Sequence, residues 1–443
     1  MKGNRFVILS AFTASLGGLL FGFDTAVISG AEKDIQQLFN LDGFWHGFTI
    51  AIALIGTLVG ALISAKPADV YGRKNALLII AILYTVSAIG SALAQTWVGF
   101  LVYRFIGGIG VGASSVIGPM YIAEIAPARL RGRLVTAFQL NIVLGIVISY
   151  FSNFWIAQVI THDAWRWMLG VESFPAIAFF FLVIFIPDSP RWLVLKGKIK
   201  EAKIILHKIG SGNPSNEIQE IEASISKNDG MRRETLFSSI YLKPLVLAIL
   251  VALFNQLSGI NAIMYYAPRI FEMAGFAQDS ALLQSVSVGI TLLIFTLVGM
   301  FLVDRVGRKK LLLVGSVGMV FFLGMVAKTV FNTATQGSVW MLIYLSGFIA
   351  FFAFSQGTVI WVFISEIFPN SVRAKGQTLG SFTHWAAAVV ISWMFPAIAE
   401  NSGGGWAFIF FSVAMAMQFL IVWKFFPETK GKSLEMIQKE MIK

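Results

Sequence analysis

The chain has 443 residues, of which 57% are hydrophobic and only 13% are charged, with a formal net charge of +11. Because soluble domains have roughly 25% charged residues, this composition excludes an ordinary soluble protein and indicates that most of the chain lies in a lipid bilayer. With no cysteine and only four histidines, thiol chemistry is excluded, and a metal site is not expected. A net positive charge can indicate a nucleic-acid partner, but here the placement of the basic residues along the chain accounts for the charge. No nucleic-acid partner is therefore predicted.

Twelve apolar segments follow one another along the chain, each close to the length of about 20 residues that crosses a bilayer. The first follows a basic N-terminus, and because no cleavage site is evident we expect this segment to be retained rather than removed as a signal peptide. Backbone groups in lipid must be satisfied within their own segment, so all twelve are predicted to be helices. The predicted spans are 7–30, 47–67, 76–95, 97–120, 134–156, 166–186, 241–272, 281–303, 310–330, 337–364, 377–398 and 405–426.

The basic residues predict the orientation of these spans. If the N-terminus is cytoplasmic, all but five of the 34 Lys and Arg residues fall on the cytoplasmic side, as the positive-inside rule requires. The five exceptions are Lys33, Arg104, Arg166, Arg269 and Lys328. We therefore expect a multi-pass membrane protein with both termini in the cytoplasm.

A long polar segment divides the chain into two similar halves. The predicted parts are a six-helix bundle at 1–186, a cytoplasmic helical linker at 187–240, a second six-helix bundle at 241–426 and a cytoplasmic tail at 427–443. Asp69, Gly72, Arg73 and Lys74 recur in the second half as Asp304, Gly307, Arg308 and Lys309. Such internal repeats are typical of transporters in which two bundles rock around a central site. The predicted fold is an all-α membrane protein with twelve transmembrane helices in two pseudo-symmetric bundles.

Several motifs lie in order at the spacing of one known family. They comprise the Gly-rich stretch from Gly17 to Gly30, the two repeated loops, Tyr103 to Gly108, Pro187 to Arg191 and Pro427 to Gly431. With this set, which covers nearly the whole chain, the sequence resembles the sugar porter family of the major facilitator superfamily, closest to the bacterial proton-coupled pentose and hexose symporters. The resemblance implies a protein of the cell (inner) membrane, a monosaccharide and a proton as partners, and no cofactor. A twelve-helix chain encloses its own cavity, so a monomer is expected to suffice.

Three ionisable residues lie inside predicted spans, where charge is costly and usually functional. At about 1.5 Å per residue, Asp24, Arg104 and Glu172 all lie roughly 9–10 Å below the outer surface, so they can form one cluster. Ionised Asp24 can pair with Arg104 and protonated Asp24 cannot, which predicts a proton switch. The resemblance implies the same role for all three. The alternative is a static ion pair that fixes helix packing.

Polar residues in the seventh span point to a sugar site, since sugar hydroxyls need amide partners and an aromatic platform. Gln256 and Asn261 would be about 140° apart on a straight helix, so a break at Ser258–Gly259 is predicted to let both face one cavity. Tyr265 and Tyr266 are predicted to form a gate. The resemblance implies further sugar contacts at Gln139, Asn255, Trp361, His384 and Trp385.

Four positions depart from the pattern of xylose symporters. Asn255 and His384 stand where glutamine is usual, Ile146 replaces a glutamine and Leu292 replaces an asparagine. Because loss of a hydrogen-bond partner changes selectivity strongly, these departures leave the particular sugar open.

Acid and base pairs at the inner helix ends are predicted to gate the cytoplasmic side, and the resemblance assigns them to stabilising the outward-facing state. The alternative is that they only determine topology. The predicted gating residues are Asp69, Arg73, Glu124, Arg129 and Arg133, with Asp304, Arg308, Glu366 and Arg373 in the second half.

The function predicted from the sequence is proton-coupled import of a monosaccharide by alternating access. A passive sugar facilitator of the same fold remains the main alternative, and Asp24 argues against it. A sugar sensor would carry a long signalling tail, and a membrane-embedded enzyme would need a catalytic motif that the sequence does not contain.

Overall fold

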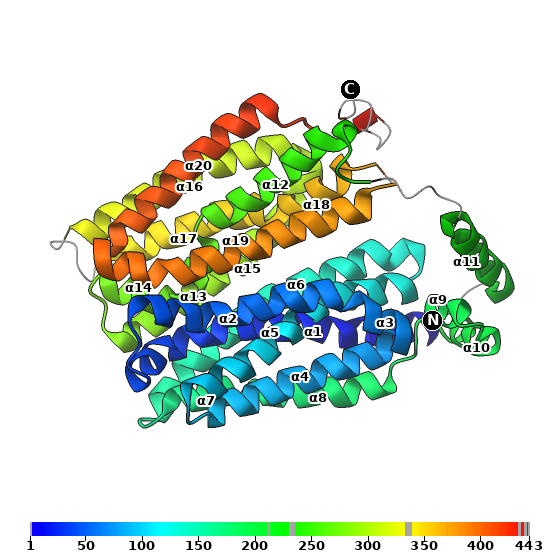
Figure 1. The fold of residues 1–443 in the computed structure, drawn as a ribbon, viewed down its shortest axis with the longest axis horizontal. Coiled ribbons are helices and arrows are strands. Elements are labelled where there is room, and N and C mark those ends of the chain that lie inside the picture. The colour runs from blue at the N-terminus through cyan, green and yellow to red at the C-terminus, as the bar shows by residue number, and fades with distance from the viewer. Residues whose placement is uncertain are drawn as a thin grey trace. The chain divides into compact units, whose positions relative to one another are not determined.

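A computed structural model of the chain describes residues 2–210, 213–229, 235–332, 339–369, 371–432, 436–437 and 441. These residues form helices and connecting segments without a β-strand. Twelve helical segments in the described ranges are long and apolar enough to cross a membrane, which confirms the predicted all-α fold (Figure 1). Parts of the predicted linker (211–212 and 230–234) and of the tail (433–435, 438–440 and 442–443) lie outside the described residues.

Two compact units make up the chain. The first unit comprises Met1–Val27, Ile52–Ser149 and His162–Arg232, and the second comprises Ile28–Ala51, Tyr150–Thr161 and Arg233–Lys443. Three helices therefore contribute to both units: α1 (Lys2–Leu38), α2 (Gly43–Ile63) and α6 (Ala128–Val159). The predicted division into two bundles, a linker and a tail stays a prediction.

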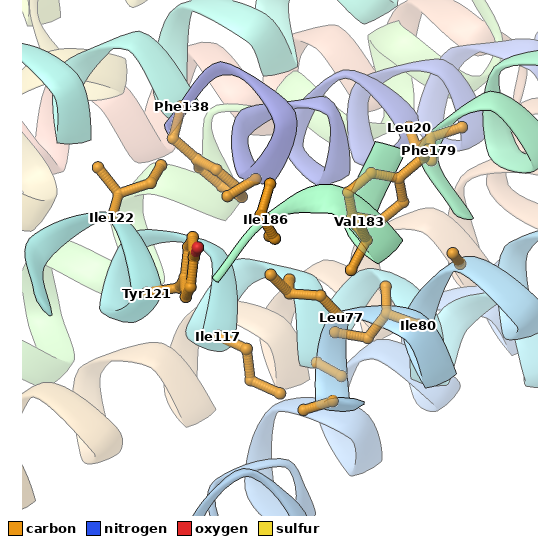
Figure 2. Packing of buried hydrophobic residues seen from close by; sticks show 14 of the residues in the cluster. Leu20, Leu77, Ile80, Ile117, Tyr121, Ile122, Phe138, Phe179, Val183 and Ile186 are labelled. Atoms are coloured by element: carbon orange, nitrogen blue, oxygen red, sulfur yellow. The ribbon is translucent and has the colours of Figure 1, made fainter. Parts of the chain in front are cut away.

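The first unit packs its helices around a continuous apolar core. Besides its parts of α1, α2 and α6, it contains α3 (Ala65–Tyr71), α4 (Arg73–Leu93), α5 (Trp97–Ile125), α7 (Ala164–Gly170), α8 (Ser173–Phe185), α9 (Pro190–Leu195), α10 (Ile199–Lys208) and α11 (Pro214–Asp229). Figure 2 shows Leu77 of α4, Ile117 of α5, Phe138 of α6 and Val183 of α8 converging in this core. Burial of such side chains contributes roughly 1.5–3 kcal/mol each, which fixes the helices that carry Asp24 and Arg104.

The second unit contains most of the remaining helices. They are the 3₁₀ helix η1 (Ser239–Tyr241), α12 (Leu242–Leu257), α13 (Ile260–Tyr265), α14 (Ala267–Met273), α15 (Gln278–Val306), α16 (Arg308–Phe331), α17 (Val339–Phe354), α18 (Gln356–Ile367), α19 (Arg373–Ser402) and α20 (Gly404–Phe425). Val251 of α12, Leu312 of α16, Phe363 of α18 and Val422 of α20 lie in one buried apolar cluster.

The seventh span is broken where the sequence predicts a break. Helix α12 ends at Leu257, and α13 begins at Ile260. Between them Gly259 has φ +83°, a left-handed conformation that glycine adopts without steric cost. A Cβ atom at this position would lie 2.3 Å from Cδ2 of Phe411, so both the backbone angle and the packing require glycine.

Four further interruptions were not predicted. Ser64 separates α2 from α3 within the predicted span 47–67, and Tyr266 separates α13 from α14 within the predicted span 241–272. The sixth span was expected to be one helix over 166–186, but it consists of α7 and α8, because Pro175 has no N–H to donate to the carbonyl of Val171. The tenth span is interrupted at Ser355, between α17 and α18. Ser355 Oγ donates to the carbonyl of Phe351 at 2.5 Å, and Thr358 Oγ1 donates to that of Ala353 at 2.8 Å, so side chains satisfy carbonyls freed at the break.

Several helices are longer than the predicted spans. Helix α1 continues to Leu38 rather than Gly30, because its polar last turns still form backbone hydrogen bonds. Hydropathy marks only the apolar part of a helix, so polar helix ends are missed by this criterion. This extension places Glu32 and Gln36 on α1.

Candidate functional site

A buried charged cluster lies in the first unit. Asp24 of α1 and Arg104 of α5 are both buried, and Arg104 Nη1 donates to Asp24 Oδ1 at 2.5 Å while Nη2 lies 3.4 Å from Oδ2. Glu172, at the junction of α7 and α8, is also buried, and it lies close enough to Asp24 and Arg104 to interact electrostatically with both. The three residues predicted to lie at one depth therefore meet.

A second polar cluster lies in the second unit at the end of α12. Gln256 Nε2 lies 3.1 Å from His384 Nε2 and donates to Asn255 Oδ1 at 3.2 Å. The ring of His384 is close to two indole rings, with centroid distances of 5.1 Å to Trp361 and 5.0 Å to Trp385. Amide groups and aromatic faces, the two elements that a sugar requires, are therefore adjacent.

The remaining residues of the predicted sugar site and gate are placed as follows. Asn261 is half-buried on α13, immediately after the break. Tyr265 and Tyr266 are buried, and the Tyr266 hydroxyl donates to the carbonyl of Ser392 on α19 at 3.2 Å. Gln139 is half-buried on α6 within the first unit. Its role in sugar binding remains a prediction.

The repeated Arg residues each lie in a cluster with two acids. In the first unit, Arg73 Nε and Nη2 donate to the two carboxylate oxygens of Glu124 at 2.9 and 3.0 Å, and Nη1 lies 3.1 Å from Asp69 Oδ1. In the second unit, Arg308 Nη2 donates to Glu366 at 2.7 Å and lies 3.2 Å from Asp304 Oδ1. Bidentate pairs such as Arg73–Glu124 are stronger than single contacts, so each cluster joins three chain segments firmly.

The other three arginines of the predicted gate lie differently. Arg129 and Arg133 are exposed on α6, and no acidic partner for either is found in the part of the chain that the structure describes. Arg373 donates through Nε to the carbonyl of Phe368 at 3.2 Å, which closes the turn before α19.

A half-buried acid follows the last membrane helix of each unit: Asp188 lies near Lys74, and Glu428 contacts Arg308. Burial raises the pKa of Asp188, although the nearby Lys74 opposes this effect. In the second unit, Glu428 Oε1 accepts hydrogen bonds from the backbone N–H groups of Arg308 at 2.9 Å and Lys430 at 3.0 Å. The two halves therefore repeat an acid at the same place, and in each acid one buried carboxylate oxygen has no hydrogen-bond partner among the described residues: Oδ1 of Asp188 and Oε2 of Glu428.

A further buried charged cluster was missed from the sequence. Glu32 of α1 lies 2.6 Å from His46 Nε2 and accepts from Arg269 Nε of α14 at 2.8 Å, and Arg269 Nη2 donates to Gln36 Oε1 at 2.5 Å. All four belong to the second unit. The residues lie outside the predicted spans or at their ends, and Arg269 is distant in sequence, so hydropathy provides no signal for the cluster. One signal was available in the sequence: Arg269 is among the five basic residues that do not fall on the predicted cytoplasmic side.

Polar residues inside three other apolar spans were also missed. Gln356, Gln418 and Ser316 are buried on α18, α20 and α16 of the second unit. Polar side chains in membrane helices usually hydrogen-bond to neighbouring helices, and their presence in apolar segments was a signal that sequence analysis did not use. Within the described residues, no group of three or more His, Cys, Asp or Glu is placed to hold a metal ion.

Twelve membrane-spanning helices with repeated charged clusters and a buried polar site define a transporter of the major facilitator fold. The sequence matches the family described as "Sugar (and other) transporter" over residues 10–441, and the chain belongs to this family.

Named relatives agree with this assignment. The chain is 40% identical to the arabinose-proton symporter of Bacillus subtilis (strain 168), over 99% of this chain and 96% of that protein. It is 37% identical to the D-xylose-proton symporter of Escherichia coli (strain K12), over 98% of this chain and 96% of that protein. It is similar to the inward-open structure of the xylose transporter XylE from E. coli, with a TM-score of 0.86 and 35% identity over 97% of this chain and 98% of that one.

Proposed function

We propose that the protein is a proton-coupled symporter that moves a monosaccharide, a pentose or a hexose, into the cell by alternating access. The named relatives are symporters of arabinose and xylose with protons, which supports this substrate class. The proposal includes the cell (inner) membrane as the location, cytoplasmic termini and a monomeric state.

The buried cluster of Asp24, Arg104 and Glu172 is the observation that carries the proposal of proton coupling. Two ionised carboxylates and one guanidinium would leave a net negative charge in a buried site, and an unbalanced buried charge costs several kcal/mol. One proton held by either Asp24 or Glu172 makes the cluster neutral. Gain or loss of that proton therefore changes the strength of the ion pair that joins α1 to α5.

The sugar is proposed to bind at Gln256, Asn261, Trp361, His384 and Trp385, with Asn255 and Gln139 contributing. The amide groups offer hydrogen bonds to hydroxyl groups, and the indole rings offer apolar faces. Trp361 is 38% exposed, so part of its ring is accessible to a ligand.

The arginine clusters around Arg73 and Arg308 are proposed to close the cytoplasmic side, with Tyr265 and Tyr266 gating the opposite side. Each arginine holds acids from two other segments in place, and these pairs must separate or move together when helices rearrange. Arg129, Arg133 and Arg373 are proposed to assist this closure through their charge.

The test of function uses purified protein in liposomes with a pH-sensitive dye inside. A panel of pentoses, hexoses and polyols is added, and sugar-induced proton entry is recorded. We expect at least one monosaccharide to drive protons inward. Asp24→Asn is expected to abolish proton entry and uphill accumulation while sugar exchange between the two sides continues. Asp279→Asn, which removes an exposed carboxyl group at the start of α15, is the matched control and is expected to leave proton entry unchanged.

Two results would contradict the proposal. Uphill accumulation retained by Asp24→Asn would remove Asp24 from coupling. Sugar entry without protons in the unmodified protein would identify a passive facilitator, in which the pair of Asp24 and Arg104 fixes helix packing only.

A further inference from the structure

A chain of hydrogen bonds leads from the proposed sugar site into the interior of the second unit. Asn255 Nδ2 donates to Gln356 Oε1 at 3.4 Å, and Gln356 Nε2 donates to Gln418 Oε1. Gln418 Nε2 in turn donates to Ser316 Oγ at 2.9 Å, and Ser316 Oγ donates to the carbonyl of Leu312 at 2.7 Å. The chain thus crosses α12, α18, α20 and α16, and its side chains are buried throughout.

The far end of this chain sets its direction. The single hydroxyl hydrogen of Ser316 points to the carbonyl of Leu312, so Ser316 Oγ can only accept from Gln418 in this arrangement. The atom of Gln418 that lies 2.9 Å from Ser316 Oγ must therefore be the donor Nε2. It follows that Gln418 presents Oε1 to Gln356, because each carboxamide has its oxygen and its nitrogen on opposite sides.

The same logic passes along the remaining carboxamides to the sugar site. Gln356 must present Nε2 to Gln418 and Oε1 to Asn255, so Asn255 must present Oδ1 to Gln256. Gln256 therefore turns its Nε2 toward Asn255 and toward a ring nitrogen of His384, which accepts only when it carries no proton. The hydrogen-bond network thus gives each of these amides one orientation.

Gln256 Oε1 is the hydrogen-bond acceptor of this network that has no donor. This atom is buried and has no hydrogen-bond partner among the described residues. An unsatisfied buried acceptor costs about 1–3 kcal/mol, and a ligand hydroxyl group that donates to it would remove this cost. A fluorine or hydrogen atom in place of that hydroxyl group would not.

We propose that Gln356, Gln418 and Ser316 are positioning residues that hold the Gln256 carboxamide with its oxygen toward the substrate. The protein then selects monosaccharides that place a hydroxyl donor at this oxygen. This inference rests on the proposed function. It adds three residues that set the sugar specificity of the protein, and none of the three is among the proposed sugar contacts. Reversal of Gln256 would require all the linked amides to reverse, and the Ser316 hydroxyl would have to give up its hydrogen bond to the carbonyl of Leu312 in order to donate to Gln418.

The test measures the affinity of purified protein for the best-bound monosaccharide and for each of its monofluoro analogues, by tryptophan fluorescence. Fluorine does not donate a hydrogen bond, so we expect one position at which fluorine weakens binding about tenfold or more, as loss of about 1.4 kcal/mol implies. Gln418→Met removes the central link at similar volume, and Ser316→Ala removes the anchor with little change of shape. Both are expected to reduce this penalty to about threefold or less, because the Gln256 amide becomes free to reverse.

Ser285→Ala is the matched control. Ser285 is buried on α15 and donates to the carbonyl of Ala281 at 2.9 Å, as Ser316 does to its own preceding turn, but it is not among the links of the chain. We expect this variant to keep the fluorine penalty of the unmodified protein.

The possible results separate this inference from the proposed function. A penalty that is the same in Gln418→Met, Ser316→Ala and the unmodified protein would overturn the inference. Equal weakening of the sugar and all its analogues would also overturn it, because that result indicates only a packing role. If no monosaccharide binds to the unmodified protein, the proposed function is wrong and this inference falls with it.

Discussion

Asp188 and Glu428 are two acids in equivalent positions whose surroundings predict opposite responses to neutralisation. Burial raises the pKa of Asp188, so its folded state holds a proton more tightly than the unfolded state does. The stability associated with this proton is fully present below the unfolded pKa of about 3.9 and is lost as pH rises through the folded pKa. At neutral pH the ionised group therefore destabilises the fold.

Asp188→Asn is expected to raise the melting temperature at about pH 7, with a gain that shrinks as pH falls toward about 4. Glu428→Gln is the comparison, and it is expected to lower the melting temperature at about pH 7. Its carboxylate accepts from two backbone N–H groups, and such charge-assisted bonds are stronger than neutral ones. Melting of the purified protein in detergent, followed by tryptophan fluorescence from about pH 4 to pH 8, checks both. A gain for Asp188→Asn that grows toward acid pH would show that the sign is wrong.

Charged residues inside the membrane spans could be located from the sequence more reliably than uncharged polar residues. Asp24, Arg104 and Glu172 were placed at one depth by counting residues, and the structure brings them together. Gln356 and Gln418 were missed because an amide within an apolar segment changes hydropathy little. Which amides face one another depends on helix packing, and no rule of spacing relates positions on α18 and α20.

The break in the seventh span depends on one glycine, Gly259. Substitution of this glycine therefore tests whether the break is needed for stability and sugar binding. Gly259→Ala would place Cβ 2.3 Å from the ring of Phe411 and would force a non-glycine residue to φ +83°. Such backbone strain costs about 1–3 kcal/mol, so we expect a lower melting temperature and weakened sugar binding, since Gln256 and Asn261 lie on either side of the break.

Gly324→Ala in α16 provides the control for this prediction. A Cβ atom at Gly324 meets nothing within 4 Å, and alanine is favoured over glycine in a helix by about 0.5–1 kcal/mol. This variant is expected to melt at the same or a higher temperature. Equal melting temperatures for the two variants would mean that the break does not require glycine.

The breaks differ in how far the sequence predicts them. Ser258–Gly259 was predicted because polar residues on both sides needed to face one site and because glycine permits the turn. The break at Ser355 was not predicted, since its freed carbonyls are satisfied by hydroxyl groups of Ser355 and Thr358, and such hydroxyl groups also occur in unbroken helices. Pro175 did indicate the end of α7 by its missing N–H, although hydropathy alone joined the two helices.

At the scale of the whole molecule, the distribution of basic residues predicts the orientation in the membrane. Because the chain has no cysteine, a single introduced cysteine gives an unambiguous label. The exposed residues His162, in the connection between α6 and α7, and Lys198, just before α10, are predicted to lie on opposite sides of the membrane.

A membrane-impermeant maleimide added to intact cells is expected to label His162→Cys and to leave Lys198→Cys unlabelled. In inside-out vesicles the result should reverse. Labelling of Lys198→Cys in intact cells would place the basic segments outside and contradict cytoplasmic termini. Permeabilised cells, in which both positions should react, provide the control for accessibility.

The overall fold could be predicted from the sequence because it is encoded redundantly. Twelve apolar segments give the spans, and the duplicated motifs around Arg73 and Arg308 give the two halves. The membership of the compact units could not be predicted, since the last turns of α1 and the first turns of α2 belong to the second unit. Contacts such as Glu32 with Arg269 join residues far apart in the chain, and only their packing in three dimensions brings them together.

The hydrogen-bonded chain from Ser316 to Gln256 has a consequence for how such a carrier acquires new substrates. Under selection for growth on a sugar that lacks the matching hydroxyl group, adaptive mutations are expected at Gln418 and Ser316, away from the residues that contact the substrate. Because these changes keep every contact residue, the existing substrate need not be lost when a new one is gained. A mutant library confined to the sugar-contacting positions would miss this route, and one that includes α16 and α20 would sample it.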